Sequence, residues 1–204
     1  MQKGEVAPHK KSYLQQIGQL IREIIPVMIG ILVALVINNW NEDRKSKKYL
    51  NQIFISIEKE LNETSIDIEK SLSKQKVLVD TLQKYMTDET IPMVDIIKKA
   101  KGLYGPTIKN YSWKAIAATN IELIEFEKIS ALSEIDQSKK SIELKLEKKL
   151  DFLYEHIKST DPEKKEVFML LVLELMSTER FLLLEIKEFL KNLKPETQES
   201  TSSK

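Results

Sequence analysis

The chain has two histidines, many carboxylates and no cysteine. Histidine and carboxylate side chains are therefore the groups that could bind a metal or carry out acid–base chemistry. A carboxylate-bridged di-iron site in a helical bundle needs Glu-x-x-His pairs, and the residue three before His156 is Leu153. The residue three before His9 is Val6. Without cysteine there is no thiolate ligand and no cysteine nucleophile. The sequence therefore indicates no metal site, and we interpret His156 as a structural or solvent-facing residue.

The glycine and serine residues do not form a phosphate-binding or nucleophile motif. Gly102 and Gly105 are not followed by the Gly-Lys-Ser/Thr of a phosphate loop, and no Gly-x-Ser-x-Gly elbow occurs. Asp and Glu are plentiful, but they fall between the apolar positions of helical repeats, which is typical of a solvated face rather than of a catalytic pair. We find no catalytic residue and no cofactor-binding motif, and we expect a protein that is not an enzyme.

The composition of the chain predicts an all-α protein. Its 204 residues are 42% hydrophobic and 31% charged, with only 5 Gly and 6 Pro to form turns. The abundant Leu, Lys and Glu favour helix. Residues 1–48 hold eight Lys/Arg and four Asp/Glu, so the basic excess lies outside the rest of the chain, which is slightly acidic. We therefore expect no nucleic-acid binding by the folded domain.

Residues 24–40, IIPVMIGILVALVINNW, carry no charge and are apolar as far as Ile37. At 1.5 Å per residue this segment extends roughly 25 Å, close to the hydrocarbon thickness of a bilayer of about 30 Å. No small-residue cleavage site follows it, as a signal peptide would require, and no polar face interrupts it, as an interfacial helix would require. A buried core helix is the alternative. We predict a transmembrane helix over residues 13–41 that follows a flexible N-terminus, residues 1–12.

Polar and aromatic residues close this apolar segment: Asn38, Asn39, Trp40, Asn41 and Glu42. Tryptophan suits the membrane–water interface, and we interpret the asparagines as solvated among the lipid head groups. The alternative is that Asn38 or Asn39 forms a hydrogen bond with a second span. Gly30 and Ala34 are four residues apart, and such a small-x-x-x-small pair would let two spans approach closely in a homodimer.

Three further helices are predicted from apolar residues spaced by three, four or seven, over residues 42–86, 122–158 and 163–193. Their one-sided apolar stripes need partners, so we expect an antiparallel helical bundle over residues 42–193, into which the transmembrane helix continues. The last helix contains seven consecutive apolar residues, but its charged residues would each cost about 2.5–3.5 kcal/mol in a bilayer. We therefore expect a buried bundle helix there and not a second span.

An irregular middle, residues 87–120, is expected to cap the membrane-distal end of the bundle. It includes a short helix over residues 91–101, a turn over residues 102–106, and a helix over residues 113–119 with Ser112 as its N-cap. Asn120 ends that helix, and Pro162 begins the last one behind Thr160 or Asp161. We interpret Trp113 as a helix–helix contact. The alternative is a ligand or partner region at Trp113 and Asn120, because irregular segments often carry function.

Residues 30–42, GILVALVINNWNE, resemble the signature of a family of small bacterial single-span membrane proteins of unknown function, G-I-L-[IV]-A-L closing in N-N-W-N-E. Residues 113–124, WKAIAATNIELI, are similar to that family's internal Trp segment, with Asn120 where many relatives have Gly. Four Lys/Arg precede the span and four follow it within residue 48, so charge alone leaves the topology open. The resemblance implies a bacterial inner-membrane location with a periplasmic C-terminal domain.

These features together predict a membrane-anchored interaction or scaffold protein with no catalytic chemistry. Its expected partners are the lipid bilayer, a second copy of the chain, and an unidentified membrane or envelope protein. The alternative is an envelope sensory module, whose bundle binds a ligand or partner near Trp113 and signals through the span. Residues 194–204 are rich in Ser, Thr and Glu, and we predict that they form a disordered tail.

Overall fold

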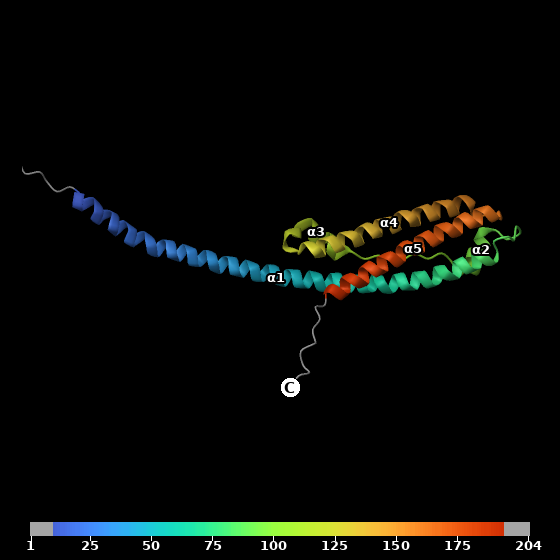
Figure 1. The fold of residues 1–204 in the computed structure, drawn as a ribbon, viewed down its shortest axis with the longest axis horizontal. Coiled ribbons are helices and arrows are strands. Elements are labelled where there is room, and N and C mark those ends of the chain that lie inside the picture. The colour runs from blue at the N-terminus through green and yellow to red at the C-terminus, as the bar shows by residue number, and fades with distance from the viewer. Residues whose placement is uncertain (1–9, 194–204) are drawn as a thin grey trace, which may run out of the picture. The chain divides into compact units, whose positions relative to one another are not determined.

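The computed structural model describes residues 10–193 (Figure 1), and side chains from residue 24 onward together with that of Arg22. In this range the chain is helical and contains no strand. The elements are α1 (Lys10–Lys84), α2 (Met93–Lys99), α3 (Tyr111–Thr119), the 3₁₀ turn η1 (Ile121–Leu123), α4 (Phe126–His156) and α5 (Pro162–Leu193). The predicted all-α class is thus confirmed. The tail predicted for residues 194–204 and most of the predicted flexible N-terminus lie outside the described residues, although α1 already begins at Lys10.

The chain divides into two compact units, Met1–Tyr49 and Leu50–Lys204. In the first unit every described residue is helical, and Pro26 lies inside the helix. In the second unit α4 and α5 are joined by a short turn and lie side by side (Figure 1). Residues 50–84 of α1 pack against both of them through shared hydrophobic clusters. The antiparallel bundle predicted from the apolar stripes is therefore present.

Two hydrophobic clusters hold this bundle together. The first joins α1, α3, α4 and α5, with buried side chains that include Ile68, Trp113, Ile142 and Leu182. The second joins α1, α2, α4 and α5. The apolar stripe predicted over residues 42–86 contributes Ile57, Leu61, Ile68 and Leu82 to the core, and near its end Leu78 is buried while Val79 is only partly buried. α5 has a buried face along its whole length, as expected of a bundle helix.

We expected the irregular middle, residues 87–120, to cap one end of the bundle, but it does not. α2 packs in the second cluster and α3 in the first, so residues 93–119 run along the bundle between the two. The predicted N-cap is also wrong: α3 begins at Tyr111, and Ser112 lies inside it. The carboxylate of Glu60 on α1 accepts hydrogen bonds from the Ser112 N–H and Oγ, at 3.1 Å and 2.7 Å. A side chain from another helix therefore accepts a hydrogen bond from a backbone N–H in the first turn of α3, which has no partner within that helix.

Two other predicted helix boundaries, the end of α3 and the start of α5, agree with the structure, and the start of α4 does not. Asn120 is the C-cap of α3, and its N–H donates to the Ile116 carbonyl at 2.9 Å. α5 begins at Pro162, and the Glu163 N–H donates to Asp161 Oδ1 at 2.9 Å, so Asp161 is its N-cap. The helix predicted to begin at residue 122 begins at Phe126 instead, because Ile124 and Glu125 have extended backbone.

The packing of α1 can be tested with two neighbouring isoleucines. Ile68 is fully buried and Ile66 is 67% exposed. Ile68→Asp places an unpaired carboxylate in the core, so we expect it to lower the free energy of unfolding by about 3 kcal/mol or more. Ile66→Asp should change it by less than about 0.5 kcal/mol. Thermal and urea unfolding of the full chain in detergent, followed by circular dichroism, measures both; equal stabilities of the two variants would contradict this packing.

Candidate functional site

The apolar segment of α1 is exposed along its whole length. Every side chain from residue 24 to 37 is exposed, from 45% at Ile24 to 67% at Val36, and Trp40 is 65% exposed. Apolar surface in water carries a free-energy cost of about 25 cal/mol per Å². Among the described residues, this is the one segment that is long and apolar enough to cross a membrane, and none of it is buried inside the protein.

The signature residues at the end of this segment contact one another within the helix. Asn38 Nδ2 donates to Glu42 Oε1 at 3.0 Å, one turn away, and the Arg44 guanidinium lies 5.9 Å from the centre of the Trp40 ring. The amide of Asn38 therefore has a partner within its own helix. A Cβ at Gly30 would meet nothing within 4 Å, so this glycine is not required for packing within the chain. The close approach of two spans at Gly30 and Ala34 stays a prediction.

Trp113 and Asn120 take different positions in the bundle. Trp113 is 7% exposed and belongs to the first hydrophobic cluster, as expected for a helix–helix contact. A hollow of about 570 Å³ lies beside it, lined by Trp113, Lys114, Ala117, Ala118, Ser133, Asp136, Gln137 and Lys140. Asn120 does not line this hollow, and its Nδ2 donates to Thr119 Oγ1 at 3.0 Å. The two predicted site residues are thus not brought together at one surface.

The segment between α2 and α3, residues 103–110, is held against α1 by hydrogen bonds rather than folded into a helix. Thr107 N–H donates to Asp67 Oδ2 at 2.6 Å, and Lys109 N–H donates to Thr64 Oγ1 at 3.0 Å. Lys109 Nζ also pairs with Glu63 at 2.7 Å. The predicted turn at residues 102–106 is present only at its start, where Gly102 has a positive φ of 110°. We call residues 103–110 the connecting segment.

A buried polar layer lies where the connecting segment meets α1, α4 and α5. Gln75, Lys149 and Glu179 are at most 1% exposed. Gln75 Nε2 donates to Glu179 Oε1 at 2.7 Å and to the Tyr104 carbonyl at 3.2 Å. Lys149 Nζ donates to the same carbonyl at 3.1 Å. Gln75 Oε1 and Glu179 Oε2 have no hydrogen-bond partner, so this layer is polar, buried and incompletely satisfied.

Burial shifts both titratable groups of this layer toward their neutral forms. Desolvation raises the pKa of Glu179 to about 7, although the hydrogen bond from Gln75 and the charge of Lys149 oppose that rise. Desolvation lowers the pKa of Lys149 to about 8, opposed by the charge of Glu179. Such paired and opposite shifts are found at functional sites as well as in structural networks.

Sequence reasoning missed all three residues of this layer, although their spacing carries a signal. Lys149 follows the buried Ile142 by seven residues, and Glu179 stands between the buried Leu175 and Leu182. Gln75 lies between Leu72 and Val79, two apolar residues that are seven positions apart. A polar residue that occurs in register with an apolar repeat is therefore the feature that could have identified the layer.

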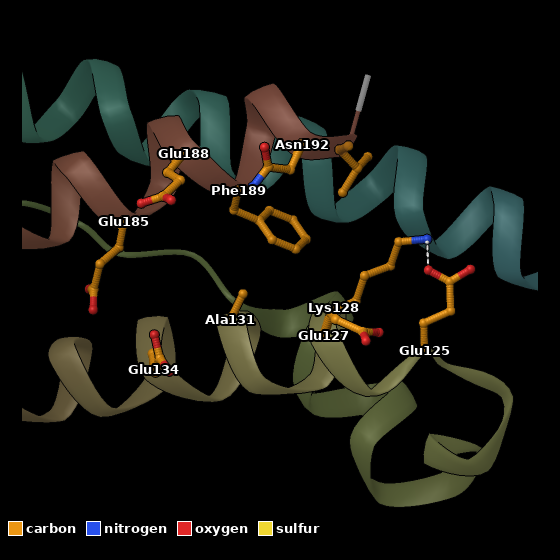
Figure 2. Close-up of a pocket in the computed structure, with 10 residues that line it drawn as sticks. Glu125, Glu127, Lys128, Ala131, Glu134, Glu185, Glu188, Phe189 and Asn192 are labelled. Carbon is orange, nitrogen blue, oxygen red and sulfur yellow. Dashed lines mark ion pairs between the residues drawn. The ribbon is translucent and has the colours of Figure 1, made fainter. Parts of the chain in front are cut away.

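A groove of about 460 Å³ lies between α4 and α5 (Figure 2). Its floor is apolar and is formed by Ala131, Phe189 and Leu193. Its other lining residues are Glu125, Glu127, Lys128, Glu134, Glu185, Glu188 and Asn192. Lys128, the one cation of this lining, pairs with Glu125 at 2.8 Å. Burial and the charge of Glu134 raise the pKa of Glu185. The groove is acidic because five glutamates and one lysine line it.

In the part of the chain that the structure describes, no three His, Asp or Glu side chains are placed to hold a metal ion. Comparison of the chain with models of known protein families, with curated proteins and with solved structures finds no match. The resemblance of residues 30–42 to a family of single-span proteins therefore stays a prediction.

The polar layer predicts a pH dependence of stability with a defined sign. Glu179 has a raised pKa in the folded state, so its stabilising contribution is complete below about pH 4.5 and is lost as the pH rises to about 7. Lys149 has a lowered pKa, so its contribution is complete above about pH 10.5 and is lost as the pH falls to about 8. Wild type should therefore lose stability relative to Glu179→Gln between pH 4.5 and 7. It should gain stability relative to Lys149→Met between pH 8 and 10.5.

Urea unfolding of the wild type and both variants across this pH range measures these differences. Glu174→Gln on the same helix is a suitable control, because Lys145 lowers the pKa of Glu174. The control should show the opposite trend at acid pH, since wild type loses the contribution of Glu174 as the pH falls. A difference between wild type and Glu179→Gln that is constant with pH would show that Glu179 ionises normally in the folded protein.

Proposed function

We propose that this protein is a membrane-anchored helical interaction protein with no catalytic role. The observation that carries the proposal is the exposed, uncharged segment from residue 24 to 37. No side chain of this segment is buried in the protein, so a bilayer is the environment that removes its surface from water. The resemblance of residues 30–42 supports a bacterial inner membrane, crossed once, with the bundle in the periplasm.

The groove between α4 and α5 is the surface that we propose for a partner. Its apolar floor and five glutamates suit a segment that combines Lys or Arg with apolar residues, since opposite charge favours encounter and apolar contact favours retention. Glu185 and Glu188 lie on one side of the groove, and Glu134 lies across from them on α4 (Figure 2). A sensory role through Trp113 stays a prediction.

The anchor can be tested by cell fractionation of the full chain. Leu32→Asp together with Leu35→Asp places two charges in the span, each of which costs about 2.5–3.5 kcal/mol at bilayer depth, so this variant should leave the membrane fraction. Ile55→Asp together with Ile66→Asp is the matched control, because both side chains are exposed apolar residues of α1 outside the span. That control should stay membrane-bound. A soluble wild type would refute the anchor.

The topology can be tested with a C-terminal tag and protease added to spheroplasts. A periplasmic bundle predicts that the tag is removed from intact spheroplasts, whereas a cytoplasmic bundle predicts that the tag is removed only after lysis. A tag that is protected in a membrane-bound protein would reverse the proposed orientation without affecting the anchor.

The groove can be tested with a synthetic amphipathic peptide of Lys and Leu as the probe. We expect the full chain in detergent to bind it in fluorescence anisotropy, and Glu185→Lys with Glu188→Lys to weaken binding by about tenfold or more. Glu163→Lys with Glu166→Lys makes the same charge change on α5 outside the groove. An equal loss in both variants would show that binding follows net charge and not the groove.

A further inference from the structure

The connecting segment covers a part of α1 that is polar although it is buried. Thr64, Ser71 and Gln75 are at most 4% exposed and lie along one face of the helix. Thr64 accepts a hydrogen bond from the segment and Gln75 donates one to it. Buried polar groups can exchange their protein partners for water, so separating residues 103–107 from this face costs less than separating two apolar faces. Ile108 is buried in the first hydrophobic cluster and holds the far end of the segment in place.

Glu179 is linked to the connecting segment by two hydrogen bonds through Gln75. Its Oε1 accepts from Gln75 Nε2, which also donates to the Tyr104 carbonyl. Its Oε2 is buried and has no partner. A protonated carboxyl tolerates this position, but an ionised carboxylate normally accepts several hydrogen bonds. Water that reaches the layer would supply them.

The charged groups around Glu179 do not neutralise it in place. Lys149 on α4 is the cation with the larger effect on the pKa of Glu179, but its ammonium donates to the Tyr104 carbonyl. Arg180 on α5 is exposed and acts on Glu179 only at longer range. On α1 the neighbours are Gln75 and Ser71, while Lys74 stacks on the Tyr104 ring at 4.0 Å. Lys145 on α4 is engaged by Glu174 at 2.9 Å.

We propose that the connecting segment, residues 103–110, is a pH-controlled cover over the polar layer, closed while Glu179 is protonated and opening when Glu179 ionises. The backbone can turn at the start of the segment, where Lys101 and Gly102 have positive φ of 66° and 110°. The far end is tied by Lys109 to Glu63, whose carboxylate is held ionised by that ammonium and does not titrate near neutral pH. This inference is independent of the membrane anchor and of the groove.

The direction of the response follows from linkage. In the closed state Glu179 has a pKa of about 7, and in an open, hydrated state it returns toward its ordinary value of 4.5. The closed state therefore binds more protons between these values, so a rise in pH from 5.5 to 7.5 favours opening. Lys149 stays protonated in both states below its pKa of about 8 and adds little to this change.

Hydrogen exchange followed by mass spectrometry on the full chain in detergent tests the cover. The amide of Thr107, which donates to α1 when the segment is closed, reports opening once its rate is corrected for intrinsic exchange. We expect its protection to fall by about tenfold or more from pH 5.5 to 7.5, the factor that corresponds to one pKa unit of coupling. The amide of Lys109, at the tied end of the segment, should keep its protection. Amides of α4 and α5 should keep their protection.

Three variants separate the cover from other causes of pH dependence. Glu179→Gln mimics the protonated carboxyl, so its segment should stay protected at both pH values. Lys149→Met removes the cation that lowers the pKa of Glu179, so the midpoint of opening should move to higher pH. His156→Gln changes a side chain that packs on Phe152, outside the polar layer, and should leave the response unchanged.

The cover would be overturned by an unchanged protection of Thr107 in the wild type. It would also be overturned by a response that persists in Glu179→Gln, or by one that α4 and α5 share equally, since the latter is global unfolding. Failure of the anchor or of the groove would leave these measurements unaffected, because each concerns a different part of the chain.

Discussion

The removal of apolar surface from water is the constraint on which the rest of this structure depends. In the bundle, the apolar faces of α1, α4 and α5 meet that requirement by packing against one another in two hydrophobic clusters. In the first unit, the described side chains of residues 24–37 are all exposed, and no described residue covers them. The same residue types therefore lead to two different outcomes, a core where the apolar residues form a stripe and a candidate span where they surround the helix.

Within the bundle, the buried polar layer has a partner in a nonhelical segment. The Tyr104 carbonyl accepts hydrogen bonds from both Gln75 and Lys149, and because Tyr104 lies outside the helices, no intrahelical hydrogen bond competes for this carbonyl. Gly105 lets the segment pass close to α4, since a Cβ at this position would lie 2.7 Å from the Leu146 side chain. The connecting segment and the polar layer thus depend on each other.

A second buried lysine has two hydrogen-bond partners for its ammonium. Lys165 is fully buried, and its ammonium donates to the carbonyls of Tyr85 and Asp88 at 3.2 Å and 2.6 Å. These carbonyls follow the C-terminus of α1, where positive charge is favourable. Glu179, in contrast, has one donor and an unpaired oxygen. The difference lies in the number of partners available to the charged form, and it is why the proposed pH response rests on Glu179.

The sequence by itself determined the helical class, the apolar segment, and the start of α5 at Pro162 behind Asp161, because each depends on local periodicity or on a cap within a few residues. It could not place the connecting segment, since the hydrogen bonds of Thr107 and Lys109 go to α1 side chains about 40 residues earlier in the chain. It also predicted that Ser112 is the N-cap of α3, whereas Ser112 lies inside this helix and donates a hydrogen bond to Glu60 on α1. Only the tertiary structure decided which of the many Lys and Glu residues are buried, because a charged residue in an apolar register is tolerated only if other elements bring it a partner.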